Sequence, residues 1–294
     1  MKKYGSITSK FYNNLDFINS PDGRIFRILA EYLGPLSLFR RKKISDTIVF
    51  FGSARAESSK VAKQNLSNVK SSVNKQSINR SKREDELKKA QMRLQLAGYY
   101  EEAKELAFHL TTWSLSVSKK KKRFVICSGG GPGIMEAANL GAKQAGGQSI
   151  GLNISLPFET NSNPFISKNL NIEFHYFFMR KLWFLYLAKA MVIFPGGFGT
   201  LDELMEVLTL IQCEKINKKM TIVLYGTHYW KEIINFDALS RWGTISPKDL
   251  KLFKFADSPQ RAFSIIKKSL EKVYLNPEIS TLDKDPPLPL KPIL

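Results

Sequence analysis

The chain has 294 residues, 43% of them hydrophobic, and a formal net charge of +19. This size and apolar content exclude a disordered or fibrous chain and predict one large domain with appendages. Two cysteines and three histidines leave no His/Cys metal set and exclude a disulfide-rich scaffold. Cys127 and Cys213 lie in apolar runs and are expected to be reduced core residues. No apolar run approaches the length that spans a bilayer, so we expect a cytoplasmic protein without a membrane partner.

Residues 1–45 are predicted to form an N-terminal helical arm ahead of the main domain. A helix is expected from Arg24 to Leu33, and Gly34-Pro35 is expected to end it, because glycine and proline commonly terminate helices.

The first strand of the sheet is predicted from Asp46 to Phe51, followed by a turn that begins with Gly52 and Ser53. The next clear helix is 99–114, so the connection is far longer than usual. We interpret residues 57–98 as an inserted basic segment. Within it, Ser58 to Ser81 has the composition of a flexible loop, and Glu84 to Leu96 could extend the next helix as a charged arm. The insertion could act as a lid or lengthen a dimer contact, and both alternatives stay open.

Much of the positive charge lies in this insertion and in the short runs 40–43 and 119–123. These segments lack the interleaved aromatic residues on which bases stack. We therefore expect no specific nucleic-acid partner, although a basic chain can bind anions nonspecifically.

A second strand and glycine turn are predicted at Phe124 to Cys127 and in SGGGPGIMEAANLGAKQAGG, 128–147. The glycine spacing differs from the dinucleotide fingerprint, and the P-loop lysine is missing. Neither NAD nor ATP is indicated.

A third unit combines the apolar run Ala190 to Phe194, the loop PGGFGTLDE at 195–203 and a helix. Its glycines are expected to adopt backbone angles denied to other residues, and the helix start presents N–H donors to an anion. Asp202 and Glu203 are expected in the first helical turn. For Asp202, helix capping and a role in chemistry are equally plausible.

Three strand ends would thus converge on one crevice, where open parallel sheets bind their ligands. The fold class predicted is α/β, a Rossmann-like doubly wound parallel sheet flanked by helices, over residues 46–275. A strand at Thr221 to Tyr225 and helices near 229–234 and 259–274 complete it, and residues 276–294 form an extended tail.

The segments FFGSAR, SGGGPGIMEAANLGA, SIGLNISLPFE, FHYFFMRK and PGGFGTLDELMEVLTLIQ together resemble the LOG family, often mislabelled as lysine decarboxylases. The resemblance spans roughly Ile48 to Leu252. It implies a Rossmann-like fold, a homodimer or higher homo-oligomer, and hydrolysis of the N-glycosidic bond of nucleoside 5′-monophosphates. The best-known substrates are cytokinin riboside monophosphates, and the products are the free base and ribose 5-phosphate. No cofactor or metal is implied.

By this resemblance, Arg180 and Glu203 are the catalytic pair. Thr209 would share a helix face with Asp202 and could serve a neighbouring subunit. The residues expected to bind substrate are Gly52, Ser53, Gly130, Gly131, Glu159, Lys181, Gly196, Gly197, Phe198, Gly199, Thr200, Asp202 and Thr209.

The chemistry of these residues fits such a reaction. A carboxylate near C1′ can offset the positive charge of an oxocarbenium-like transition state and activate water, which favours Glu203. Arg180 suits bidentate contact with a phosphate or a base, and Lys181 adds positive charge. The amides of Gly197 to Thr200, with the Thr200 hydroxyl, would hold the 5′-phosphate. We find no lysine suited to pyridoxal phosphate.

Three functions remain open: the hydrolase above, a broader nucleoside monophosphate nucleosidase, and a noncatalytic nucleotide- or cofactor-binding module. The presence of Arg180 and Glu203 disfavours the third. Arg180 and Lys181 could alternatively be a solvated basic pair at a helix start. Phe178, Met179 and Trp183 could line a base pocket or be ordinary packing residues.

Overall fold

The fold is built on one parallel β-sheet. The computed structural model describes residues 10–73, 80–118, 121–155 and 162–276. Its seven strands run in the order β4-β3-β2-β1-β5-β6-β7, and every neighbouring pair is parallel. They are β1 (Thr47–Phe51), β2 (Val125–Ser128), β3 (Ser149–Ile154), β4 (Asn171–Phe174), β5 (Ala188–Ile193), β6 (Thr221–Tyr225) and β7 (Phe253–Ala256). The predicted Rossmann-like α/β fold is confirmed.

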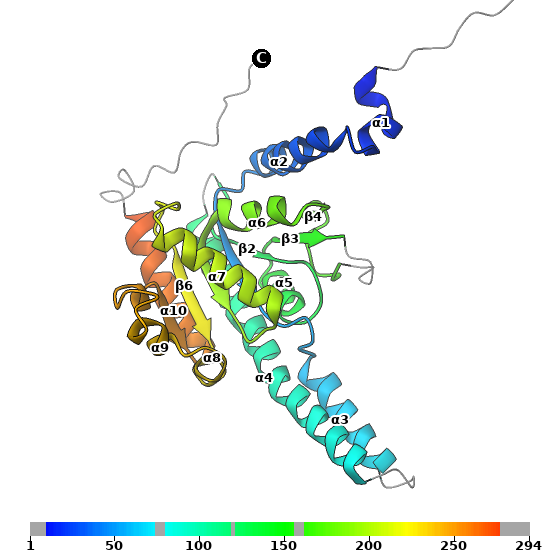
Figure 1. The fold of residues 1–294 in the computed structure, drawn as a ribbon, viewed down its shortest axis with the longest axis vertical. Helices are drawn as coiled ribbons and strands as arrows, with labels where there is room; N and C mark the ends of the chain where they lie inside the picture. Colours follow the sequence, from blue (N-terminus) through cyan, green and yellow to red (C-terminus); the bar gives the residue numbers. More distant parts are fainter. Residues whose placement is uncertain (1–9, 74–79, 119–120, 156–161, 277–294) are drawn as a thin grey trace, which may run out of the picture.

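Helices cover both faces of this sheet, because alternate residues of each central strand point to opposite sides. Val49 of β1 packs in one hydrophobic cluster, and its neighbours Ile48 and Phe50 pack in the other. The first cluster includes α2 (Arg24–Arg41), α6 (Phe177–Tyr186) and α7 (Phe198–Gln212). The second includes α4 (Arg80–Val117), α5 (Ile134–Gln144) and α10 (Pro259–Leu270). Figure 1 shows these layers around the central strands.

The strand order reverses beside β1. The chain builds β2, β3 and β4 outward on one side of β1 and then returns to place β5 on its other side. The reversal therefore lies between β1 and β5, and doubly wound sheets form their ligand crevice at the carboxyl ends of such strands.

The N-terminal arm corrects one expectation. Helix α2 does not end at Gly34 but continues through Pro35 to Arg41. Proline removes the hydrogen bond to the carbonyl four residues earlier, here that of Glu31. The Trp183 indole Nε1–H of α6 donates to that carbonyl over 2.9 Å, so a tertiary contact satisfies the group that Pro35 leaves unpaired. A short helix α1 (Leu15–Asn19) and a 3₁₀ turn (Phe11–Asn13) precede α2.

The insertion is a helical hairpin that projects from the body (Figure 1). The predicted extension of the 99–114 helix is confirmed, because α4 begins at Arg80. The expectation of a flexible loop over 58–81 is wrong where α3 (Ser59–Val73) forms. Although this segment is mostly polar, Ala62, Leu66 and Val69 form an apolar stripe at helical spacing. Ala62 is buried, and so are Ala90 and Ala97 on α4.

The remaining described elements are α8 (Thr227–Ile233), α9 (Phe236–Arg241), a 3₁₀ turn (Asp249–Lys251) and a π-helical turn (Glu271–Leu275). The helix predicted over 259–274 is α-helical only as far as Leu270, and the π turn forms its last part. Cys127 is buried, but Cys213 follows α7 and is exposed, contrary to the core position expected. Across the described ranges, no helix has an apolar stretch of bilayer-spanning length.

Candidate active site

Three loops meet where β1, β2 and β5 end. The Ser53 N–H donates to the Pro195 carbonyl over 2.9 Å, which joins the loop after β1 to the loop after β5. The Ile134 N–H donates to the Ser53 carbonyl over 3.1 Å, which joins the loop after β2 to the same residue. Gly52 and Ser53 therefore lie between the two other glycine loops, as the sequence predicted.

The loop after β2, which holds Gly130 and Gly131, is fixed by a buried asparagine. The Asn163 side-chain amide donates to the carbonyls of both glycines over 3.0 Å. Gly130 has a φ of +77°, and a Cβ there would lie 2.2 Å from the Asn153 side chain. Only glycine fits this turn without displacing its neighbours.

The loop after β5 differs in detail from expectation. Helix α7 begins at Phe198 with Gly197 as its N-cap, so Asp202 and Glu203 lie in the second turn and not the first. The capping interpretation of Asp202 is therefore wrong. Among the three glycines of this loop, none adopts a positive φ. Gly196 is required for space, because a Cβ would lie 2.1 Å from the Thr200 Oγ1.

Gly197 and Gly199 have a different surrounding. A Cβ at either position would meet no atom within 4 Å, so the start of α7 faces open space. Phe198 lies between them with 93% of its surface exposed. The Thr200 N–H donates to the Gly197 carbonyl over 3.0 Å, and the Tyr229 hydroxyl donates to the Gly196 carbonyl over 2.6 Å. Hydrogen bonds to the carbonyls of Gly196 and Gly197 thus hold the loop in place, while open space remains beside Gly197 and Gly199.

Arg180 connects helix α6 to the loop after β2. Its Nε donates to the Leu152 carbonyl over 2.7 Å, and its Nη2 donates to the Gly129 carbonyl over 3.3 Å. The guanidinium also lies over the Phe184 ring, 5.1 Å from its centroid. Backbone and aromatic contacts thus hold the planar fork in one orientation.

Lys181 faces the carboxylates of α7. Its ammonium lies 2.8 Å from Asp202 and 3.1 Å from Glu206, and 17% of its side chain is exposed. The alternative of a solvated basic pair is therefore excluded for Lys181. The residue was expected to add charge for a substrate, whereas in this structure its charge is shared by two carboxylates.

Glu203 is the buried acid of this cluster, with 8% of its surface exposed. Burial raises the pKa of Glu203 to about 7, Lys181 and Arg180 act to lower it, and Glu206 and Asp202 act to raise it. A carboxyl group that titrates near neutral pH can exchange a proton under physiological conditions. Such perturbed groups in a crevice are typical of catalytic sites.

Other predicted residues lie elsewhere or are not described. Thr209 is exposed on α7 and donates to the Met205 carbonyl over 2.7 Å. Glu159 falls in 156–161, outside the described residues. Met179 and Trp183 are buried in the core, which favours the packing interpretation for both, while Phe178 is 50% exposed.

Sequence reasoning missed three residues that shape the site. Glu206 follows Glu203 by three positions and Asp202 by four, so helical spacing alone could have placed it beside them. Tyr229 and Asn163 reach the glycine loops from distant parts of the chain. No local pattern in the sequence marks either contact.

One family model matches part of the chain. The family model described as "Possible lysine decarboxylase" matches residues 135–266, which include Arg180 and Glu203. The predicted resemblance to the LOG-type family, to which this description is often given, is confirmed. No curated protein matches the chain.

Among solved structures, TM1055, a Northeast Structural Genomics Consortium target, is 19% identical with a TM-score of 0.45; the match covers 76% of this chain and 99% of that one. The Moco carrier protein from Chlamydomonas reinhardtii is 17% identical with a TM-score of 0.42, and the match covers 77% of this chain and 99% of that one.

Proposed function

We propose that this chain is a hydrolase that cleaves the N-glycosidic bond of nucleoside 5′-monophosphates. Its resemblance to the LOG-type family supports a nucleotide-related function. The observation that carries this proposal is the buried Glu203, with a pKa near 7, beside Arg180 and the glycine loops. The substrates proposed are AMP or N6-modified AMP of the cytokinin riboside monophosphate type.

The open start of α7 suits the 5′-phosphate. The amides of Gly197, Phe198 and Gly199 begin the helix, where N–H groups lack intrahelical acceptors and the helix dipole favours an anion. The Thr200 amide is committed to the Gly197 carbonyl. Binding the phosphate here would fix C1′ relative to α7, so that binding energy remote from the scissile bond contributes to catalysis.

Glu203 then acts at the sugar. In its ionised form it offsets positive charge at C1′ and takes a proton from the attacking water. Arg180 contacts the phosphate or a ring nitrogen of the departing base and is held in place by the carbonyls of Gly129 and Leu152. Lys181, which pairs with Asp202 and Glu206, keeps these carboxylates away from the anionic substrate.

The proposal extends to assembly and location. We propose a homodimer in the cytoplasm, with the exposed face of α7 at the interface. Thr209 and Met205 lie on that face, and Met205 is 38% exposed. Light scattering of the purified chain would test the dimer, because a monomer at micromolar concentration contradicts it.

The function is tested by chromatography of reaction mixtures without added metal. Purified protein is incubated with a panel of nucleoside 5′-monophosphates and with the matching unphosphorylated nucleosides. We expect free base from the monophosphates only, and loss of hydrolysis with retained binding in Glu203→Gln. Glu232→Gln, which removes an exposed carboxylate of α8, is the matched control and is expected to retain full activity.

Three outcomes would contradict this proposal. Equal cleavage of many purine and pyrimidine monophosphates would indicate the broader nucleosidase. Nucleotide binding without release of any base would indicate a noncatalytic module, and turnover by Glu203→Gln would contradict the role given to that carboxylate.

A further inference from the structure

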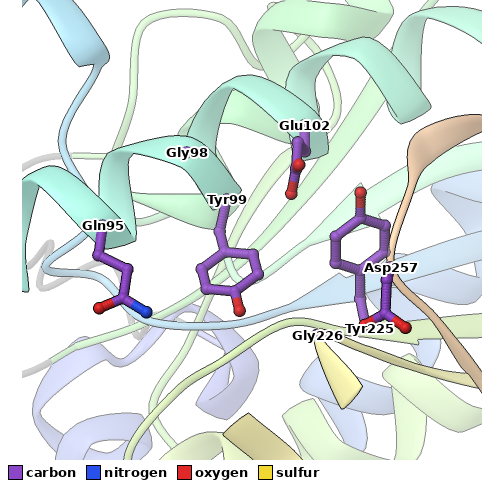
Figure 2. A pocket seen from close by; sticks show the side chains of 7 residues that line it. All are labelled: Gln95, Gly98, Tyr99, Glu102, Tyr225, Gly226 and Asp257. Atoms are coloured by element: carbon purple, nitrogen blue, oxygen red, sulfur yellow. The ribbon is translucent and has the colours of Figure 1, made fainter. Parts of the chain in front are cut away.

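A separate cavity opens where helix α4 passes the ends of β6 and β7. Its volume is about 240 Å³. The lining includes Gly98, Tyr99, Glu102, Tyr225, Gly226 and Asp257, and none of these belongs to the candidate active site. In Figure 2, Tyr99 and Glu102 extend from α4 toward Tyr225 and Asp257. The space is large enough for a small organic molecule.

The chain has a net charge of +19, but the described residues that line this cavity carry no positive charge. They include two carboxylates and two phenols, and none of them is a lysine or an arginine. Burial raises the pKa of Glu102, the adjacent Tyr225 hydroxyl acts to lower it, and the nearby Glu105 and Asp257 carboxylates act to raise it. Burial is also the largest cause that raises the pKa of Tyr99 and of Tyr225, and the nearby Glu102 carboxylate is the second. Each shift has the direction expected where a cation is missing.

The Tyr225 side chain supplies a second indication. It is fully buried, its hydroxyl lies beside the Glu102 carboxylate, and its hydroxyl oxygen accepts no hydrogen bond among the described residues. The Tyr99 and Tyr225 rings meet edge to face with centroids 6.2 Å apart. Buried hydroxyl groups are normally paired, and aromatic walls attract cations.

Gly98 opens the cavity from the helix side. It lies in the interior of α4, where glycine is a poor helix former, and a Cβ there would meet no atom within 4 Å. Helix packing therefore does not require glycine at this position. A larger side chain would extend into the empty space beside Tyr99.

The donor requirements select the kind of cation. Within the described part of the chain, no three His, Cys, Asp or Glu residues group as a metal site would need. Asp257 accepts from the Thr227 N–H over 2.6 Å and from its Oγ1 over 2.7 Å, and each carboxylate oxygen can accept once more. We propose that this cavity binds a small organic cation through a primary ammonium group, which donates to Glu102, Asp257 and the Tyr225 hydroxyl.

Calorimetric titration of the full chain tests this site with 1,4-diaminobutane and butylamine, and with 1-butanol as the neutral analogue. We expect the amines to bind and the alcohol not to. Glu102→Gln keeps the shape and should weaken amine binding about tenfold or more, because it removes a charged partner. Gly98→Leu fills the cavity and should abolish binding. Glu86→Gln removes an exposed carboxylate about 24 Å away along the same helix and should change nothing.

The proposal is overturned if neither amine binds, or if 1-butanol binds as tightly as butylamine. Unchanged amine affinity in Gly98→Leu would also overturn it, and this variant leaves every charge in place. Circular dichroism verifies that each variant is folded before titration. If Glu102→Gln unfolds, Gly98→Leu decides the question alone.

Discussion

The Lys181 ammonium lies 2.8 Å from the Asp202 carboxylate, and this ion pair joins helix α6 to helix α7. Glu206, one turn further along α7, lies 3.1 Å from the same ammonium. Helix α6 also carries Arg180, and α7 carries Glu203. The ion pairs therefore fix the two expected catalytic side chains relative to each other, which makes Lys181 a positioning residue.

Replacing Lys181 with methionine should shift the pH dependence of hydrolysis. The ammonium lowers the pKa of Glu203, so its removal should raise that pKa above 7. The acid limb of the kcat/KM profile should then move to higher pH, with a lower rate at pH 7. Lys181→Arg should restore most of the wild-type profile. Lys215→Met is the control for charge at an exposed site, and an acid limb that stays in place in Lys181→Met contradicts the electrostatic role.

Replacing Glu203 with glutamine should stabilise the protein above neutral pH. Its pKa rises from 4.5, the ordinary value, to about 7 on folding, so the folded state keeps a proton that the unfolded state releases. Stability is therefore lost as pH rises from about 4.5 to about 7. Glu203→Gln should be more stable than wild type by up to about 3 kcal/mol at pH 8, and equal to it at pH 4. Urea unfolding at the two pH values measures this, and a difference that does not depend on pH would refute it.

Alanine substitutions at two adjacent glycines should differ in their effect on stability. In Gly196→Ala the new Cβ would lie 2.1 Å from the Thr200 Oγ1, so the loop must shift and the melting temperature should fall. In Gly197→Ala the Cβ meets no protein atom within 4 Å, so stability should be unchanged. If this open space receives the phosphate, KM should rise in Gly197→Ala. Thermal melts measure the stability of both variants, and steady-state kinetics measure KM. Equal loss of stability in both variants would contradict the prediction.

The contact between Trp183 and the Glu31 carbonyl should stabilise the N-terminal arm. Trp183→Phe removes the indole donor from that partly buried carbonyl, which should cost about 1 kcal/mol. Pro35→Ala supplies a backbone N–H at the position that would pair with Glu31 in a regular helix. Trp183→Phe should therefore cost less in the Pro35→Ala background than in wild type. Chemical denaturation of the four proteins of this cycle measures the coupling, and identical costs in both backgrounds would disprove it.

The central strands and the glycine loops were predictable from the sequence. Strands β1, β2 and β5 contain the apolar runs Ile48 to Phe51, Val125 to Cys127 and Ala190 to Ile193, which lead into glycine-rich turns. Such runs are typical of buried parallel strands. Strand β4 is partly exposed, and only Phe174 at its end is buried. Strand β7 has the same mixed pattern. Edge strands contact the core on fewer sides, so their sequences carry a weaker signal.

Helix boundaries were less predictable, because they depend on partners far away in the chain. Pro35 was expected to end α2, but the Trp183 indole satisfies the carbonyl that proline leaves unpaired. The polar segment that forms α3 becomes a helix where it can pack its short apolar stripe on α4.

The sequence by itself determined which residue types surround the site: glycine turns after apolar strands, a basic pair on α6, and two acids on α7. These follow from local backbone sterics and helical periodicity. Only the tertiary structure decided that Lys181 pairs with Asp202 and Glu206 and that Glu203 is buried enough to titrate near pH 7. Ion pairing and desolvation depend on the packing of α6 against α7 and the sheet, and the order of residues along the chain does not specify that packing.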